Sequence, residues 1–327
     1  MNHSKYVFSQ LTSFLNRSQF NDYVRKYHGD KYVKHFTCWN QLLTLMFGQL
    51  SNRESLRDLI TIIEAHHQKC YHLGLGKHVT RSNLAKANTN RDYRIFEDFA
   101  FFHITTASVH DSQAMKEILV ETGAYYIFDR GYNNFKELYR IHRMESFFVV
   151  RAKNNLQYKC VTWRRRLPKG ILTDAEIELT IYKSQKDYPE HLRLVRFYDD
   201  EQQREFMFLT NAMELTALQV ADLYKNRWQI ELFFKWLKQH LKIKKFWGTS
   251  ENAVRIQIYS AISVYCLVAI VQHDMLLDRS TYEVLQILSM SLTDTTHLKE
   301  LFDKTTFKND KDRSGSSEPD LFENFKF

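Results

Sequence analysis

The sequence predicts a mixed α/β protein preceded by an all-helical N-terminal domain, and three patterns lead to this class. Apolar residues recur at helical spacing through residues 1–75, which predicts helices throughout that part. Two short apolar runs, at 124–128 and 147–150, are typical of buried strands, and a helical pattern separates them. Residues 176–209 contain further short strand patterns. Strands and helices that alternate in this way indicate the α/β class.

Composition indicates what kind of partner the protein binds and in which compartment it is expected. The chain has 327 residues and a net charge of +8, and this excess of cations favours a polyanionic partner. Its four cysteines contain no C-x-x-C pair, which indicates reduced thiols in a cytoplasmic protein. The N-terminal segment lacks a signal-peptide pattern, and the most apolar run, at 261–271, is too short to span a bilayer. We therefore expect a cytoplasmic protein without a membrane segment.

The N-terminal part contains several helix signals. Ser51 and Glu54 have the spacing of a capping box that would open a fourth helix, and Asn90 is a candidate N-cap further on. The stretch at 76–100 is basic, so this part could bind DNA, but a domain that only packs fits the pattern equally well. A His-His-x-x-Cys group at 66–70 could suggest a metal, although the second pair of ligands that a zinc site needs is not found.

The apolar run at 124–128 leads directly into Asp129. Before it, residues 101–109 alternate weakly and predict a strand, and a short helix containing Met115 is expected to end at Gly123. In open α/β sheets, sites form beyond the carboxyl ends of strands, which is where Asp129 would lie. The alternative is that Asp129 only begins a turn before a glycine.

Between residues 147 and 173 the chain carries cations and no acid. Since a solvated surface usually mixes both signs, this stretch is a candidate for contact with phosphates. The residues that we expect to bind DNA here are Arg151, Lys153, Arg164, Arg165, Arg166 and Lys169.

Residues 224–238 are the most informative stretch. Their apolar spacing predicts one helix with apolar stripes on two sides, so the helix is expected to be buried on both flanks. Tyr224, Arg227, Glu231 and Lys238 then fall on a narrow polar strip between the stripes. One interpretation is an i,i+4 pair of Arg227 with Glu231 on a solvated face. The other is a carboxylate that holds a metal ion while the cations hold a phosphate.

These residues carry a resemblance to a known family. The spacing Tyr224-x2-Arg227-x3-Glu231-x6-Lys238 matches the YREK signature of insertion-sequence DDE transposases of the IS-four type, which the chain resembles. Asp129, in IFDRGY and followed by FFVVRAKNN, is similar to the second-aspartate motif of that family. The resemblance includes the N-terminal bundle and extends through the long helix expected near the C-terminal end. It implies an RNase H-like catalytic core, interrupted by a β-strand insertion before the helix that carries the glutamate.

The resemblance implies phosphoryl transfer on DNA, with strand cleavage at the ends of the element and then strand transfer into a target. In this family three carboxylates hold two Mg²⁺ or Mn²⁺ ions, and Asp129 and Glu231 match the second and third of them. Tyr224, Arg227 and Lys238 match positions that hold phosphates near the cleaved strand. The implied partners are the terminal inverted repeats and target DNA, bound by a homodimer, and no membrane.

The first catalytic aspartate of the family has no match in this chain. Its motif, an Asp followed by Ser or Thr at a strand end, is not found. Upstream of Asp129 only the strand at 101–109 is expected, where the RNase H order has three. We interpret this as an internal deletion near Ala100 that removed two strands and one metal ligand. Asp98 and Asp111 are the nearest acids that could replace it, and Asp111 is better explained as a helix cap.

The sequence therefore predicts a DNA transposase of a bacterial insertion sequence with impaired activity. The alternative is a non-catalytic DNA-binding remnant that binds element ends or inhibits an intact transposase, and an RNase H-like nuclease with another nucleic-acid substrate stays open. The expected organisation is a helical domain at 1–75, a basic linker or helix at 76–100, the first part of the core at 101–157, a β-rich insertion at 158–212, a helical second part with the YREK helix at 213–300 and a disordered tail at 301–327.

Overall fold

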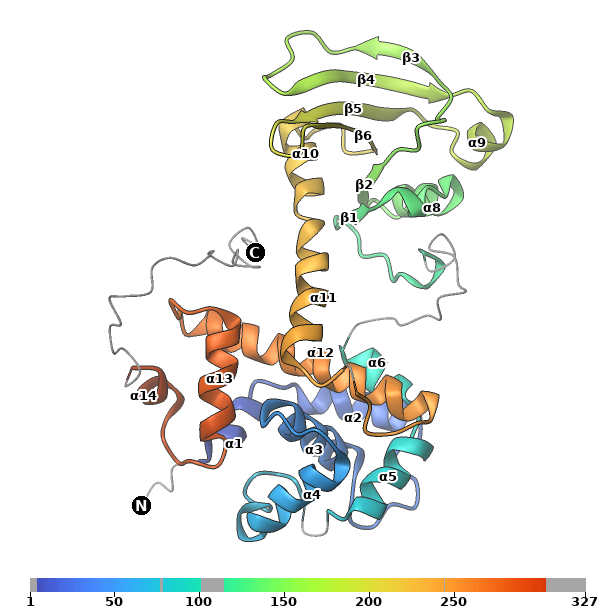
Figure 1. Ribbon diagram of the computed structural model, residues 1–327. Coiled ribbons are helices and arrows are strands. Elements are labelled where there is room, and N and C mark those ends of the chain that lie inside the picture. The colour runs from blue at the N-terminus through green and yellow to red at the C-terminus, as the bar shows by residue number, and fades with distance from the viewer. Residues whose placement is uncertain (1–4, 77–78, 101–114, 244, 304–327) are drawn as a thin grey trace. The chain divides into compact units, whose positions relative to one another are not determined.

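The computed structural model describes residues 5–76, 79–100, 115–243 and 245–303. The chain divides into two compact units (Figure 1). The first comprises Met1–Ile104 with Phe233–Phe327, and the second comprises Thr105–Leu232. The boundary between Leu232 and Phe233 falls inside helix α11 (Trp228–His240), so both units contribute to the segment expected as the helical second part of the core.

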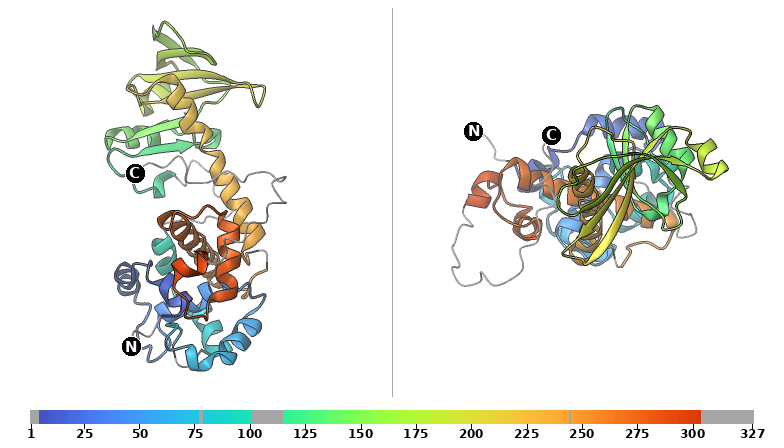
Figure 2. Two further views of the ribbon diagram at one scale, coloured as in Figure 1. Left: turned by 90° about the vertical axis from the view of Figure 1, so that its left-hand side faces the viewer. Right: turned by 90° about the horizontal axis from the view of Figure 1, so that it is seen from above.

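The first unit is a bundle of helices, whose apolar side chains form one buried core. The long helix α12 packs against α3, α5, α6 and α13. Figure 2 shows the helices of this unit from two further sides. The helices of this unit, besides the second half of α11, are α1 (Val7–Thr12), α2 (Arg17–Lys26), α3 (Cys38–Leu50), α4 (Leu56–Ala65), the 3₁₀ turn η1 (His67–Lys69), α5 (Arg81–Asn90), α6 (Arg94–Ala100), α12 (Glu251–Asp274), α13 (Thr281–Ser291) and α14 (Leu298–Asp303).

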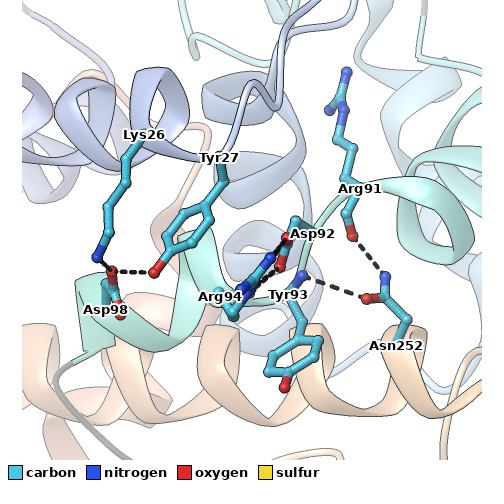
Figure 3. Close-up of polar contacts among 8 residues, drawn as sticks. All are labelled: Lys26, Tyr27, Arg91, Asp92, Tyr93, Arg94, Asp98 and Asn252. Carbon is cyan, nitrogen blue, oxygen red and sulfur yellow. Dashed lines mark hydrogen bonds and ion pairs between the residues drawn. The ribbon is translucent and has the colours of Figure 1, made fainter.

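Asn252, in the first turn of α12, links the C-terminal helices of this unit to its N-terminal helices. Its amide donates to the carbonyl oxygens of Asn88 (2.8 Å) and Arg91 (2.6 Å), and its Oδ1 accepts the N–H of Tyr93 (3.3 Å), as Figure 3 shows for the last two residues. These bonds satisfy backbone groups between α5 and α6 that helix ends leave open. The N-terminal and C-terminal helices therefore fold together.

The long apolar helix expected near the C-terminal end is confirmed as α12. Ser250 caps it, since the Ser250 hydroxyl accepts the N–H of Ala253 (3.2 Å). By length and composition α12 could cross a bilayer, but 72% of its most apolar window is buried. That burial is typical of a core helix in a folded protein.

Two predicted helix starts are wrong. Ser51 follows the end of α3, and α4 is capped by Ser55, whose hydroxyl accepts the N–H of Asp58 (3.1 Å). Asn90 is the last residue of α5 and begins no helix. Serine and asparagine suit both ends of helices, because their short side chains bond equally well to nearby backbone groups outside regular helix.

The second unit is built on a six-stranded sheet with the strand order β1-β2-β6-β5-β4-β3. β1 and β2 are parallel, and the other neighbouring strands are antiparallel. β6 pairs with β2 (Val149 opposite Thr210), so the insertion extends the sheet of β1 and β2. The strands are β1 (Tyr125–Phe128), β2 (Phe147–Arg151), β3 (Tyr158–Trp163), β4 (Ile171–Leu179), β5 (Leu192–Asp199) and β6 (Arg204–Thr210).

Helices cover both faces of this sheet, which confirms the mixed α/β class. Phe148 and Val150 of β2 pack into the core formed with α8 (Phe135–Arg143) and the segment after α9 (Tyr182–Asp187). Val149, which points to the opposite face, packs with α10 (Ala217–Lys225). α10 therefore packs on the face of the sheet next to β1 and β2.

In the region before β2, two elements differ from the expectation, and some expected features lie outside the described residues. Tyr125 is 42% exposed, so β1 is not buried on both faces; among the described strands it pairs only with β2. The helix expected around Met115 is a 3₁₀ turn, η2 (Met115–Glu117). The strand expected at 101–109, together with Asp111 and the tail beyond residue 303, lies outside the described residues.

The single helix expected at 224–238 is two helices. α10 ends at Lys225, and a turn at Asn226 and Arg227 separates it from α11. The N–H of Arg227 donates to the carbonyl of Tyr224 (3.0 Å), which is the i→i−3 pattern of a tighter turn. Asparagine is a weak helix former, which favours the break at this point.

Burial of α11 on both flanks is also wrong. Trp228 and Ile230 are 56% and 52% exposed, and Phe234 is 38% exposed. Only Trp236 and Leu237 of this helix are buried, both in the core of the first unit. Apolar periodicity shows which residues share one side of a helix, but it does not show whether another element covers that side.

Candidate active site

Asp129 lies directly after β1 and begins the 3₁₀ turn η3 (Arg130–Tyr132). Its Oδ1 accepts the backbone N–H of Arg130 (2.7 Å), so Asp129 does begin a turn, as the simpler interpretation expects. The same oxygen also accepts the hydroxyl of Tyr224 (3.0 Å). The end of β1 and the end of α10 therefore meet at this carboxylate.

Aromatic packing fixes the position of Tyr224. Its side chain is buried, and its ring centroid lies 4.6 Å from that of Phe208 and 6.0 Å from that of Phe206. Burial raises the pKa of Tyr224, and the neighbouring Asp129 charge raises it further. The hydroxyl therefore stays protonated at neutral pH and serves as a donor to Asp129.

Arg227 contacts both carboxylates of the predicted site. Its Nη2 lies 2.8 Å from Oε1 of Glu231, and its Nη1 lies 4.0 Å from Oδ2 of Asp129. The i,i+4 pair that the simpler interpretation predicts is present, and the same guanidinium also lies within 4.0 Å of Asp129. These two carboxylates and the Tyr224 hydroxyl all belong to the second unit.

The site holds Asp129 and Arg227 in their charged forms. Burial alone would raise the pKa of Asp129, but hydrogen bonds from Arg130 and Tyr224, with the charges of Arg227 and Arg151, lower it below the usual value. Burial alone would lower the pKa of Arg227, whereas its hydrogen bond to Glu231 and the charge of Asp129 raise it. Asp129 is therefore an anion throughout the neutral range, and Arg227 a cation.

Two more arginines surround Asp129, and the sequence-based prediction names only one of them. Arg151, at the end of β2, lies over the ring of Phe206 at 4.9 Å, and its carbonyl accepts the amide of Asn133 (2.7 Å). Asn133 also donates to the carbonyl of Arg130 (2.8 Å). Arg130 and Asn133 were missed; their position just after Asp129 was the available signal.

Three guanidinium N–H groups near this carboxylate are buried and have no hydrogen-bond partner in the described part of the chain. They are the Nε–H groups of Arg130, Arg151 and Arg227. Buried donors without partners are rare in folded proteins, and guanidinium groups match the oxygens of phosphate well. The arrangement has the chemistry to accept an anion beside Asp129.

The other predicted phosphate contacts are distributed between the units. Lys238 is exposed on the part of α11 that belongs to the first unit, so its role stays a prediction. In the second unit, Lys153 is exposed after β2, and Arg165, Arg166 and Lys169 are exposed in the β3–β4 hairpin. The hairpin also contains one anchored arginine.

Arg164 is that anchored residue. Its Nη2 donates to the carbonyl of Met213 (3.0 Å), and its Nε lies 3.9 Å from the buried carboxylate of Asp174. These contacts join the hairpin to the segment before α10. Arg164 is therefore less available for phosphate than the two arginines that follow it.

The structure describes one of the two acids proposed to replace the missing aspartate, and that acid is engaged in the first unit. Asp98 accepts hydrogen bonds from Lys26 (2.8 Å) and from the hydroxyl of Tyr27 (2.9 Å) within the first unit (Figure 3). Asp111 lies outside the described residues. Across residues 5–76, 79–100, 115–243 and 245–303, no group of three His, Cys, Asp or Glu side chains is placed to hold a metal ion. Two carboxylates that already contact Arg227 do not fit the three-carboxylate, two-ion arrangement.

Comparison with protein families finds two matches. A family model described as a domain of unknown function, DUF4372, matches residues 3–76. A model described as a transposase DDE domain matches residues 63–267, which is more than half of the chain and includes Asp129, Tyr224, Arg227 and Glu231.

Several curated proteins are similar to this chain. A Sinorhizobium fredii protein that carries the name transposase y4zB is 38% identical over 57% of this chain and 52% of its own length. A Geobacillus stearothermophilus protein named as a transposase for insertion sequence element IS5377 is 32% identical over 50% and 43%. A Synechocystis protein named as a transposase for IS4SA is 30% identical over 48% and 45%. The chain spans about half the length of the curated relatives it matches.

Proposed function

The chain belongs to the family of DDE-domain transposases, and from that premise we propose that it binds the ends of a bacterial insertion sequence but is impaired in cutting them. It is assigned to the IS-four type with the YREK signature, and its second unit to an incomplete RNase H-like core. Its partners are the terminal inverted repeats and target DNA, bound as a homodimer in the cytoplasm.

The contact of Arg227 with both Asp129 and Glu231 carries this proposal. In a DDE site, carboxylates from a strand end and a following helix must reach the same point. The two residues lie far apart in the sequence, yet one guanidinium lies within 4.0 Å of both carboxylates. Arg227 also keeps a buried N–H without a partner in the described residues, which suits a phosphate oxygen of the bound strand.

Divalent Mg²⁺ or Mn²⁺ supplies the activation of the attacking hydroxyl in this family. The residues described here do not fit the complete pair of ions, because the first aspartate is missing and no described acid replaces it. An internal deletion near Ala100 accounts for the missing ligand. Loss of one catalytic carboxylate costs several kcal/mol in the barrier, which reduces the rate by orders of magnitude.

The remaining groups are proposed to bind and position DNA. Tyr224 donates to Asp129 and keeps it oriented, and Arg227 holds a phosphate beside it. Lys238, Arg151 and the other basic residues named from the sequence, including Lys153 and those of the β3–β4 hairpin, track the DNA backbone, where each neutralised phosphate releases counterions.

A non-catalytic role in which this chain inhibits an intact transposase is the second candidate. The hydrogen bonds of Asp98 with Lys26 and Tyr27 favour it, because they leave one of the two candidate replacement acids engaged in the first unit. Such a protein would bind the same ends and compete with the intact enzyme for them.

The test is a binding and cleavage assay on the DNA that flanks the reading frame. Purified full chain is incubated with labelled end duplex, with Mg²⁺, Mn²⁺ or EDTA, over a range of salt concentrations. We expect a retarded complex that weakens as salt rises and no nicking with either ion, and a weaker complex with a shuffled duplex. Efficient nicking at the element end would refute the impaired site, and absence of binding at low salt would refute the DNA-binding function.

A further inference from the structure

We propose that Arg227 is an internal cation that holds Asp129 and Glu231 together, and that a divalent ion must displace it to bind these carboxylates. The inference rests on the proposed function, because it takes Asp129 and Glu231 as the acidic part of the site. It adds a role that differs from phosphate contact. In this chain the carboxylates of Asp129 and Glu231 share one arginine as their counter-charge.

The backbone holds Arg227 in the position that this role requires. Arg227 lies in the turn between α10 and α11, where its N–H bonds to the Tyr224 carbonyl (3.0 Å) and its carbonyl accepts the N–H of Ile230 (3.1 Å). Its guanidinium carbon lies 5.7 Å from the centre of the Tyr224 ring. The side chain is 22% exposed, less than those of Asp129 (43%) and Glu231 (48%). The cation is therefore more enclosed than the anions it contacts.

The charges explain why the guanidinium and a divalent ion exclude each other. Within the described part of the chain, Arg227 is the only side-chain cation within 4 Å of either carboxylate. A divalent ion would coordinate the same oxygens, and at that distance from Arg227 the two cations would repel each other strongly. An ion can bind only when the guanidinium moves away and breaks its hydrogen bond to Glu231.

The missing third acid shifts this competition. A complete site offers three carboxylates to its ions, whereas the described residues offer two, and one guanidinium neutralises much of their charge. Two partly exposed carboxylates hold a divalent ion weakly in competition with an enclosed arginine.

The test measures Mn²⁺ binding to the full chain by titration calorimetry or by the Mn²⁺ electron paramagnetic resonance signal. Arg227→Gln removes the charge and keeps a polar side chain, and we expect it to bind Mn²⁺ at least tenfold more tightly than the unmodified chain. Arg227→Lys keeps the charge, but its single nitrogen cannot contact both carboxylates at once. Its Mn²⁺ affinity is expected to lie between those of the unmodified chain and Arg227→Gln. Equal affinities in all three proteins would overturn the proposal.

Lys225→Gln is the matched control, since it removes one positive charge nearby. Lys225 is 61% exposed and pairs with Glu201 (3.2 Å), away from both carboxylates. Its Mn²⁺ affinity is expected to stay within twofold of the unmodified chain. An increase as large as that of Arg227→Gln would mean that net charge, and not the position of Arg227, governs binding, and would overturn the proposal.

A second readout separates this role from a purely structural one. Without metal, Arg227→Gln leaves two carboxylates without their shared cation, so its melting temperature should fall, and saturating Mn²⁺ should restore it. A fall that Mn²⁺ does not reverse would contradict the competition. DNA binding is measured on the same proteins: its failure would reject the proposed function while the Mn²⁺ result still decides the role of Arg227.

Discussion

Replacing Asp174 with asparagine is expected to lower the free energy of unfolding of the second unit by about 3–5 kcal/mol, because it leaves a buried guanidinium without its counter-charge. Arg193 is 1% exposed, and its Nε and Nη2 each donate to the Asp174 carboxylate at 2.8 Å. Its Nη1 donates to the carbonyls of Ala212 (3.2 Å) and Leu215. The pair thus joins β4 and β5 to the segment that leads into α10.

Urea unfolding followed by circular dichroism measures this effect. Glu176→Gln is the control, because Glu176 lies two residues further along β4 and pairs with His191 (2.7 Å) where both side chains are substantially exposed. Its cost is expected to be below about 1 kcal/mol. Equal costs for the two substitutions would show that Asp174 and Arg193 do not carry the stability of the sheet.

Removing three exposed cations from the β3–β4 hairpin is expected to produce the largest change in DNA binding. In the variant Arg165→Gln, Arg166→Gln and Lys169→Gln, each lost phosphate contact lowers the salt slope of the association constant by about 0.9. Over three contacts, the unmodified chain should lose about 40-fold more affinity than the variant between 50 and 200 mM salt. Fluorescence anisotropy with labelled end duplex, repeated over this salt range, measures both slopes.

A control with the same change in net charge separates a local contact from a general attraction. Lys136, Lys183 and Lys186 are exposed cations of α8 and α9 in the same unit. Their replacement by glutamine should leave the salt slope within about 0.5 of that of the unmodified chain. If both triple variants lose the same slope, the hairpin is not a specific contact surface.

Sequence patterns predicted the strands and most helices well where one physical signal dominates. β1 and β2 are short apolar runs and α12 contains the most apolar stretch of the chain, and the structure contains each of them. The turn at Asn226 escaped the periodicity because one tightened turn changes the angular positions of apolar residues very little. β3 escaped it because its residues are mostly exposed and adjoin the arginine run, so no apolar alternation marks it.

The spacing of residues in the sequence was enough to name part of the candidate site. Tyr224 and Arg227 lie near Asp129, and Glu231 pairs with Arg227, although two helices and the turn between them supply these residues; their chemical roles stay predictions. The contact of Arg227 with both carboxylates could not be predicted from the sequence, because it depends on where the distant strand β1 ends. The Asp174–Arg193 pair was not predictable, since its two residues meet only through the register of β4 and β5.

Iron-mediated cleavage of the polypeptide tests most directly whether Asp129 and Glu231 bind the same ion. Fe²⁺ bound in place of Mn²⁺, with ascorbate and peroxide, cuts the backbone next to its ligands, and mass spectrometry locates the cuts. In the Arg227→Gln protein we predict cuts near residues 129 and 231 together, both abolished by adding Asp129→Asn. Cutting near residue 231 that persists unchanged after Asp129→Asn would contradict a shared site.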